Sequence, residues 1–190
     1  MRKNIRAIFV ISALVVLVMC SACVLPGSEK PVVNQGFSQV STQEISNYIS
    51  FEEVKQKFND YSSINGSTEK LPVYYIFSRD VDSSGNATTW LFGVRKSTGT
   101  ELLMYDRAGW KIIPWNATLP SKEIILNQVV SPNTLFIKNN DEIFSASSAS
   151  VQERRDLVLK DGLYTLTITS GSTSRILTFN ATTGALITKV

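Results

Sequence analysis

The 190-residue chain contains no histidine, and it has no cysteine after position 23. The lack of histidine excludes Ser–His and Cys–His nucleophilic catalysis and removes the commonest zinc ligand. With Cys20 and Cys23 both near the N-terminus, the rest of the chain offers no thiol and forms no internal disulfide. No paired carboxylates and no phosphate-binding glycine loop stand out. We therefore predict a protein that is not an enzyme, with no catalytic residues, no metal site and no cofactor.

An excess of positive charge is also missing from most of the chain. Three of the 19 lysines and arginines precede Cys23, whereas none of the 16 acidic residues does, so the remainder carries sixteen charges of each sign. Nucleic-acid binding depends on a concentrated positive potential that contacts phosphates. We predict no nucleic-acid partner.

The N-terminus has the pattern of an export signal. Arg2, Lys3 and Arg6 precede an apolar run over 7–19. A helix of that length rises about 20 Å, which is too short for a hydrocarbon core of about 30 Å and fits the apolar part of a signal peptide.

The residues that follow, Met-Cys-Ser-Ala-Cys over 19–23, resemble the lipobox of prokaryotic lipoproteins. The resemblance implies removal of residues 1–22 and lipidation of Cys23, which would hold the protein at the outer face of the cell membrane or cell envelope. Cys20 stands where an aliphatic residue is usual. An ordinary signal peptide cut near Ala22 and an uncleaved membrane anchor are therefore the alternatives.

Residues 23–43 are largely polar, and their few apolar residues show no regular spacing. This pattern is typical of a flexible tether. An irregular strand through 31–33 is the alternative.

Residues 44–118 have the pattern of one α+β unit. Ser50 and Glu53 form a capping-box pattern at the start of a helix. One apolar stripe follows at helical spacing: Phe51, Val54, Phe58 and Tyr61. Four strands joined by short turns are predicted at 73–79, 88–95, 100–106 and 110–114.

The pattern of residues 119–190 repeats this order. A helix is predicted from Ser121 to Val130, ended by 131–133, and two weaker segments at 134–138 and 142–146 follow. Four strands are then predicted at 155–159, 163–169, 175–179 and 184–187. The expected fold is α+β, with one helix packed on an antiparallel meander and the whole unit repeated twice.

Two short motifs resemble the PepSY family. They are the helix start Ile49-Ser50-Phe51-Glu52-Glu53 and the turn Phe179-Asn180-Ala181-Thr182-Thr183-Gly184-Ala185-Leu186. The first unit's counterpart of the turn, 105–112, is one residue shorter and lacks the threonine. The resemblance implies two PepSY-like units and a role in binding or restraining an exported peptidase, without catalytic residues.

Two further patterns involve polar turn residues. Asn-x-Ser/Thr sequons make four asparagines candidate glycosylation sites: Asn65, Asn86, Asn116 and Asn180. Residues 80–86 imitate the start of a calcium loop, but Leu91 stands where a bidentate glutamate is needed. We interpret 80–86 as a hairpin turn.

Aromatic residues are concentrated in the first unit. Strand alternation places one set in the core and leaves another able to line a groove for peptide or glycan. The candidate binding surface consists of Trp90, Phe92, Trp110 and Trp115. The predicted function is a membrane-anchored surface lipoprotein that binds a peptide or an exported protein partner. The alternative is a structural or glycosylated cell-envelope accessory protein without a specific ligand.

Overall fold

A computed structural model describes residues 47–64, 71–145 and 153–190, which belong to one compact unit, Ile45–Val190. The predicted signal peptide, the predicted lipidation site Cys23, the predicted tether and Asn65 lie outside the described residues. No helix within the described ranges is long and apolar enough to cross a lipid bilayer.

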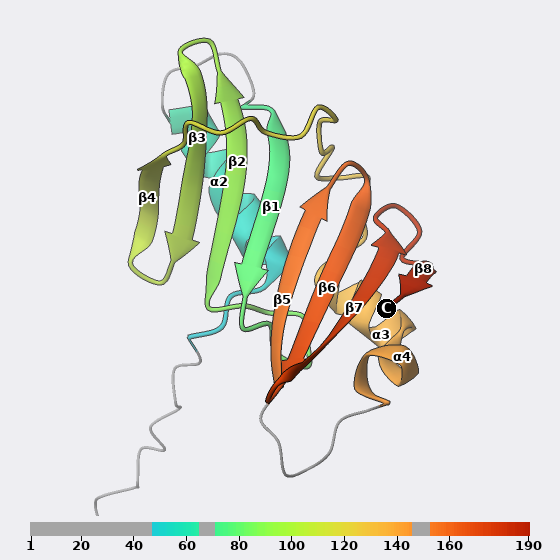
Figure 1. Ribbon diagram of the computed structural model, residues 1–190. Helices are drawn as coiled ribbons and strands as arrows, with labels where there is room; N and C mark the ends of the chain where they lie inside the picture. Colours follow the sequence, from blue (N-terminus) through green and yellow to red (C-terminus); the bar gives the residue numbers. More distant parts are fainter. Residues whose placement is uncertain (1–46, 65–70, 146–152) are drawn as a thin grey trace, which may run out of the picture. The chain divides into compact units, whose positions relative to one another are not determined.

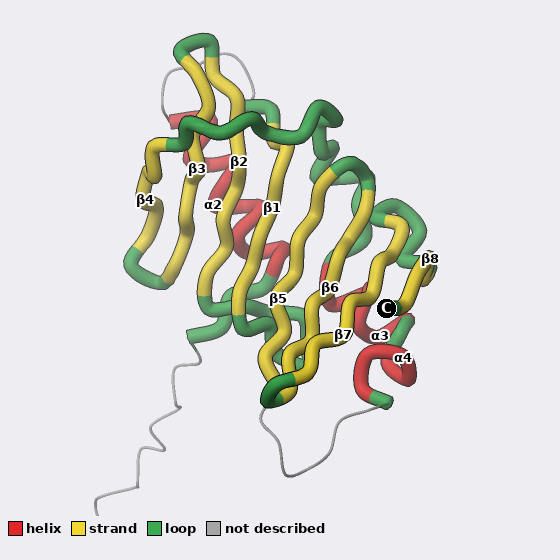
Figure 2. Tube along the Cα trace, viewed as in Figure 1, coloured by secondary structure: helices red, strands yellow, loops and turns green. Residues whose placement is uncertain are grey.

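Within these described ranges, eight strands form one antiparallel sheet (Figures 1 and 2). They are β1 (Val73–Arg79), β2 (Thr89–Lys96), β3 (Gly99–Asp106), β4 (Gly109–Pro114), β5 (Glu153–Lys160), β6 (Leu163–Ser170), β7 (Thr173–Asn180) and β8 (Leu186–Lys189). Their order across the sheet is β4-β3-β2-β1-β5-β6-β7-β8. The sequence predicted each strand to within a few residues.

The expected architecture of a helix on a meander, repeated twice as PepSY-like units, is wrong. The described residues form a β-rich fold in which both sets of strands belong to one continuous sheet. The join is the antiparallel pairing of β1 with β5, where Ile76 lies opposite Leu159 and Phe77 opposite Val158. Pairing two strand edges satisfies backbone groups that each separate meander would have left exposed.

The helices of the second half also differ from the prediction. Residues 121–130 form no helix, whereas the two weaker segments fold as α3 (Pro132–Lys138) and α4 (Asn140–Phe144). Ser131, expected to end a helix, instead caps one: its side chain accepts a hydrogen bond from the Thr134 N–H. Pro132 follows within the first turn, where its missing N–H costs no helical hydrogen bond.

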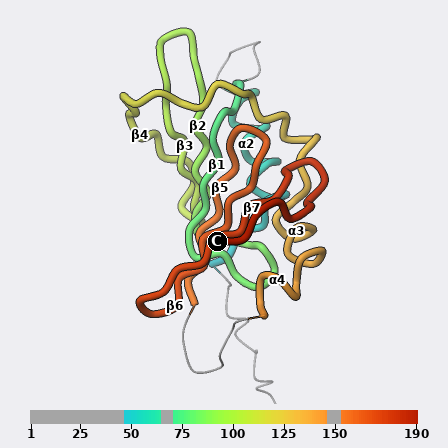
Figure 3. The backbone as a smooth tube through the Cα atoms, turned by 45° about the vertical axis from the view of Figure 1, so that its right-hand side comes forward, coloured from blue at the N-terminus to red at the C-terminus, as the bar shows by residue number. Residues whose placement is uncertain are grey.

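The helices lie on one face of the sheet (Figure 3). The first of them, α2 (Phe51–Ile64), begins as predicted, because the Ser50 hydroxyl accepts a hydrogen bond from the Glu53 N–H at 3.1 Å. Its apolar stripe packs on the first four strands, with Phe58 stacked on Phe92 at a centroid distance of 4.9 Å. Alternate strand residues on this face form the core, among them Ile76, Phe92, Leu103, Leu159, Leu166 and Phe179.

The opposite face carries no described helix, and we call it the open face (Figure 3). The strand registers align one residue of each strand into a row that crosses it. That row runs Lys111, Met104, Leu91, Phe77, Val158, Thr165, Thr178 and Thr188. The open face is therefore apolar over its central strands and rich in threonine toward β8.

Candidate functional site

Two of the four candidate binding residues lie in the core. Trp90 is 1% exposed and Phe92 is fully buried, both beneath α2. The indole N–H of Trp90 donates to the Ile49 carbonyl at 2.9 Å, which fixes the chain just before the helix. These two side chains cannot contact a ligand here, so this part of the predicted binding surface is wrong.

Trp110 lies on β4, at one edge of the sheet, and is half-buried. Its ring contacts four others, with the shortest centroid distance, 4.8 Å, to Tyr105. The other three rings belong to Phe58, Tyr61 and Phe92. This aromatic cluster fixes the edge strand against the body of the protein.

The β4 edge is straight. All six residues of β4 pair with β3 without a register shift, from Asp106 opposite Gly109 to Glu101 opposite Pro114. Beside Trp110, Ile112 is 54% exposed. Along the side of β4 that faces away from β3, no described strand supplies hydrogen-bonding partners, which makes the backbone there a template for another strand.

The β8 edge has a different form. It is four residues long, and its register with β7 shifts between Thr178 and Phe179. Lys189 follows the shift and pairs with Glu142 of α4 at 2.9 Å. Short length and a bulge are features that discourage a further strand from pairing with an edge, whereas β4 is two residues longer and pairs without a bulge. Of the two edges, β4 is the better acceptor.

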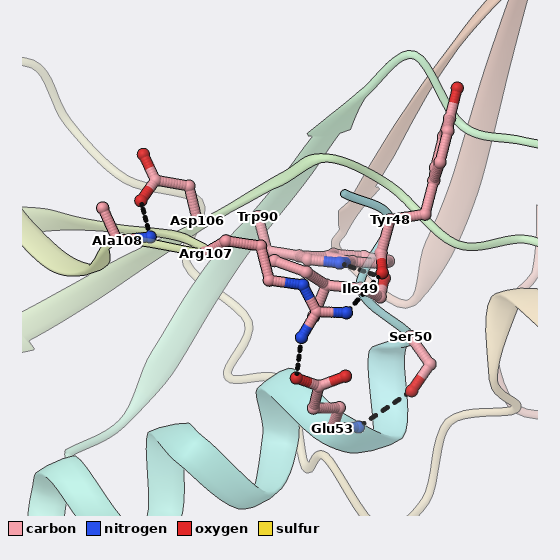
Figure 4. Close-up of polar contacts among 8 residues, drawn as sticks. All are labelled: Tyr48, Ile49, Ser50, Glu53, Trp90, Asp106, Arg107 and Ala108. Carbon is pink, nitrogen blue, oxygen red and sulfur yellow. Dashed lines mark hydrogen bonds and ion pairs between the residues drawn. The ribbon is translucent and has the colours of Figure 1, made fainter. Parts of the chain in front are cut away.

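Arg107 holds the hairpin that carries β4. It lies in the turn between β3 and β4, and its guanidinium donates to the Glu53 carboxylate and to the Tyr48 carbonyl, both at 2.7 Å (Figure 4). The Glu53 carboxylate therefore binds the β3–β4 hairpin and does not cap the start of α2. The acceptor edge is joined to the first turn of α2 at this end.

The same turn lowers the pKa of a carboxyl group. Lys111 donates a hydrogen bond to Asp106 at 2.6 Å, and the Ala108 N–H donates a second at 2.9 Å. These bonds, with that of Lys111 the larger cause, lower the pKa of Asp106 below its ordinary value of 3.8. Both bonds remain within the hairpin, so Asp106 has a structural role.

The three sequons in the described residues differ in their surroundings. The Asn180 side chain accepts hydrogen bonds from the N–H groups of Thr182 and Thr183, and that of Asn86 donates to Asp82. Asn116 is exposed in the segment after β4. Only Asn116 combines exposure with a side chain that makes no hydrogen bond to the described residues.

The loop that imitates a calcium site closes on itself. The Asp82 carboxylate accepts hydrogen bonds from the backbone N–H groups of Ser84 and Asn86, both at 2.8 Å. Within the described ranges, no group of three or more acidic or cysteine side chains is arranged to hold a metal ion. The loop is a hydrogen-bonded turn.

Ile112 and Arg107 are not among the binding residues predicted from the sequence. Strand alternation places Ile112 on the same face as Trp110, but only the strand order reveals that β4 is an edge. Arg107 could have been noticed only as a charged residue in a turn, because its partners lie more than fifty residues earlier. Comparison with protein-family models, curated protein sequences and solved structures finds no match.

Proposed function

We propose that this protein is an exported, lipid-anchored surface module that binds an extended segment of another exported protein. The segment adds to β4 as a ninth strand, in the manner known as β-augmentation. The observation that carries the proposal is the contrast between the straight, firmly held β4 edge and the short, bulged β8 edge.

The side chains along β4 indicate what the added strand contains. On the helix side it would lie beside Trp110 and Ile112, and on the open face beside Lys111 and Ile113. Alternate positions of the ligand would therefore carry apolar or aromatic side chains that pack on the two helix-side residues. Pro114, which has no N–H to donate, limits pairing at the end of β4.

The test uses the full-length protein in vesicles and a phage-displayed library of random decapeptides. Ile112→Lys places a charge on the β4 edge, and Ile187→Lys places the same charge on the β8 edge. The two isoleucines are 54% and 55% exposed, which makes the variants a matched pair. Peptides enriched on the wild type should bind Ile187→Lys equally and lose at least tenfold in affinity for Ile112→Lys.

Hydrogen exchange locates the bound peptide. We expect it to protect alternate backbone amides within 110–113, those that do not already pair with β3. Failure to enrich any peptide, equal binding to both variants, or protection confined to another segment would overturn the proposal. Membrane retention of Cys23→Ser equal to that of the wild type would overturn the lipid anchor alone.

A further inference from the structure

The open face carries a groove that is separate from the β4 edge. The groove has a volume of about 510 Å³, within the usual range of about 300–1,000 Å³ for small-molecule sites. Its floor includes Tyr75, Leu91 and Leu102, and one wall is formed by Trp115 and the segment through Leu119. The floor and wall are largely apolar, and the groove opens to solvent.

The wall is built into the fold. Leu119 is 5% exposed although it lies outside the main core, and it packs on the open face over Gly93. A Cβ atom on Gly93 would lie 2.8 Å from Leu119 Cδ2 and 2.9 Å from Tyr75 Cβ. The Thr100 hydroxyl donates to the Trp115 carbonyl at 2.9 Å and fixes the start of the wall. Gly93 thus leaves room for the segment from Trp115 to Leu119, and the hydrogen bond from Thr100 holds the start of that segment in place.

The far side of the groove carries two adjacent opposite charges, Lys160 and Asp161. Both are exposed, and neither forms an ion pair with any of the described residues. The floor contributes a polar group as well, because the hydroxyl of Tyr75 makes no hydrogen bond within the described ranges. Partial burial raises the pKa of Tyr75, so it stays a neutral donor near neutral pH.

We propose that the groove binds a free α-amino acid with an apolar or aromatic side chain. The ligand's side chain lies on Leu91 and Leu102 beside Trp115, its carboxylate meets Lys160, and its ammonium group meets Asp161. The two charges of a zwitterion match the two charges at the groove, while the apolar floor provides burial for one side chain. Binding at this site is independent of strand addition at β4.

Calorimetric titration of the full-length protein with phenylalanine tests the site. Three related probes are titrated in parallel: N-acetylphenylalanine lacks the ammonium charge, phenylalaninamide lacks the carboxylate, and glycine lacks the side chain. We expect phenylalanine to bind, and each of the other three to bind at least tenfold more weakly.

Two variants test which residue contacts each charged group of the ligand. Lys160→Gln should weaken phenylalanine about tenfold and leave phenylalaninamide unchanged, and Asp161→Asn should weaken phenylalanine and leave N-acetylphenylalanine unchanged. Asp161 has φ of +52°, a conformation that asparagine also accepts. Lys57→Gln, on the exposed side of α2, is the control for loss of one positive charge.

Ile112→Lys separates this site from the proposed function, since it should leave phenylalanine binding intact. Absence of phenylalanine binding at millimolar concentration would overturn the proposal. So would equal binding of all four probes, or equal binding by wild type and Lys160→Gln.

Discussion

The side chain of Leu119 lies over Gly93, so closely that a Cβ atom on Gly93 would approach Leu119 Cδ2 to 2.8 Å. The same atom would lie 2.9 Å from Tyr75 Cβ, which is bonded to the backbone of the neighbouring strand and cannot rotate aside. Glycine at this position allows the segment after β4 to lie on the open face.

Gly93→Ala should therefore destabilise the protein by about 1–3 kcal/mol, the usual cost of overpacking. Chemical denaturation measures the free energy of unfolding. In a double-mutant cycle, Gly93→Ala should cost less in a Leu119→Ala background than in the wild type, but part of the cost should persist because the contact with Tyr75 remains. An unchanged free energy of unfolding in Gly93→Ala would contradict the close packing.

Ser78 is 1% exposed, and its hydroxyl has no hydrogen-bond partner in the described structure. Ser78→Ala should raise the free energy of unfolding by about 1 kcal/mol, because burying an unpaired polar group is costly. Ser62→Ala is the matched control, since its buried hydroxyl donates to the Phe58 carbonyl at 2.8 Å. Ser62→Ala should not raise the free energy of unfolding. Destabilisation by Ser78→Ala, measured by thermal and chemical unfolding, would disprove this reading.

Arg107 joins the β3–β4 turn to Glu53 and to the Tyr48 carbonyl. Arg107→Met should accelerate hydrogen exchange of the β4 amides, because one end of the hairpin is released. The free energy of unfolding should fall by about 1 kcal/mol or less, since the bonds of Arg107 are partly exposed to solvent. Arg79→Met, a change at an exposed arginine, serves as the control. Equal exchange rates in both variants would show that Arg107 does not hold the edge.

The lowered pKa of Asp106 predicts a pH dependence of defined sign. The folded state favours the ionised carboxyl, so the stabilisation is fully present above the ordinary pKa of 3.8 and is lost as pH falls through the folded value. A carboxyl titration followed by NMR should give a pKa below 3.8 in the wild type. Lys111→Met should move that pKa upward by removing the hydrogen bond that is the main cause. No upward movement would refute the assignment.

Asn180 and Asn116 belong to identical Asn-Ala-Thr sequons but differ in structural role. Asn180→Ala removes the acceptor for two backbone N–H groups and should cost about 1–2 kcal/mol. Asn116→Ala, at an exposed site, should change the free energy of unfolding by less than about 0.5 kcal/mol. Urea denaturation of both variants provides the comparison, and similar losses would contradict the distinction.

Local pattern predicted the strands and the first helix well. The Ser50 cap and the stripe through Phe58 depend on neighbouring residues, and both are present in the structure. The helices after Ser131 are not predicted from local pattern, because Ser131 and Pro132 fit the end of a helix over 121–130 as well as the start of α3. The chain between β4 and α3 instead packs irregularly, with Leu119 on the open face and Ile124 in the main core.

The candidate site was predicted only in part. Strand alternation correctly grouped Trp90 with Phe92, but it could not tell which face α2 would cover. Trp110 was recognised as an aromatic residue, whereas its place on an edge strand depends on the order of all eight strands. The lipid anchor at Cys23 remains a prediction from sequence.

The sequence by itself determined the strand positions, the balanced charge of the residues after 22 and the absence of histidine chemistry. These depend on residue type and on spacing over a few positions. Only the tertiary structure decided that β1 pairs with β5, that β4 and β8 are the edges, and that Lys160 lies beside a groove walled by Trp115. These relationships arise when backbone groups far apart in the chain satisfy one another, and local patterns do not specify those partners.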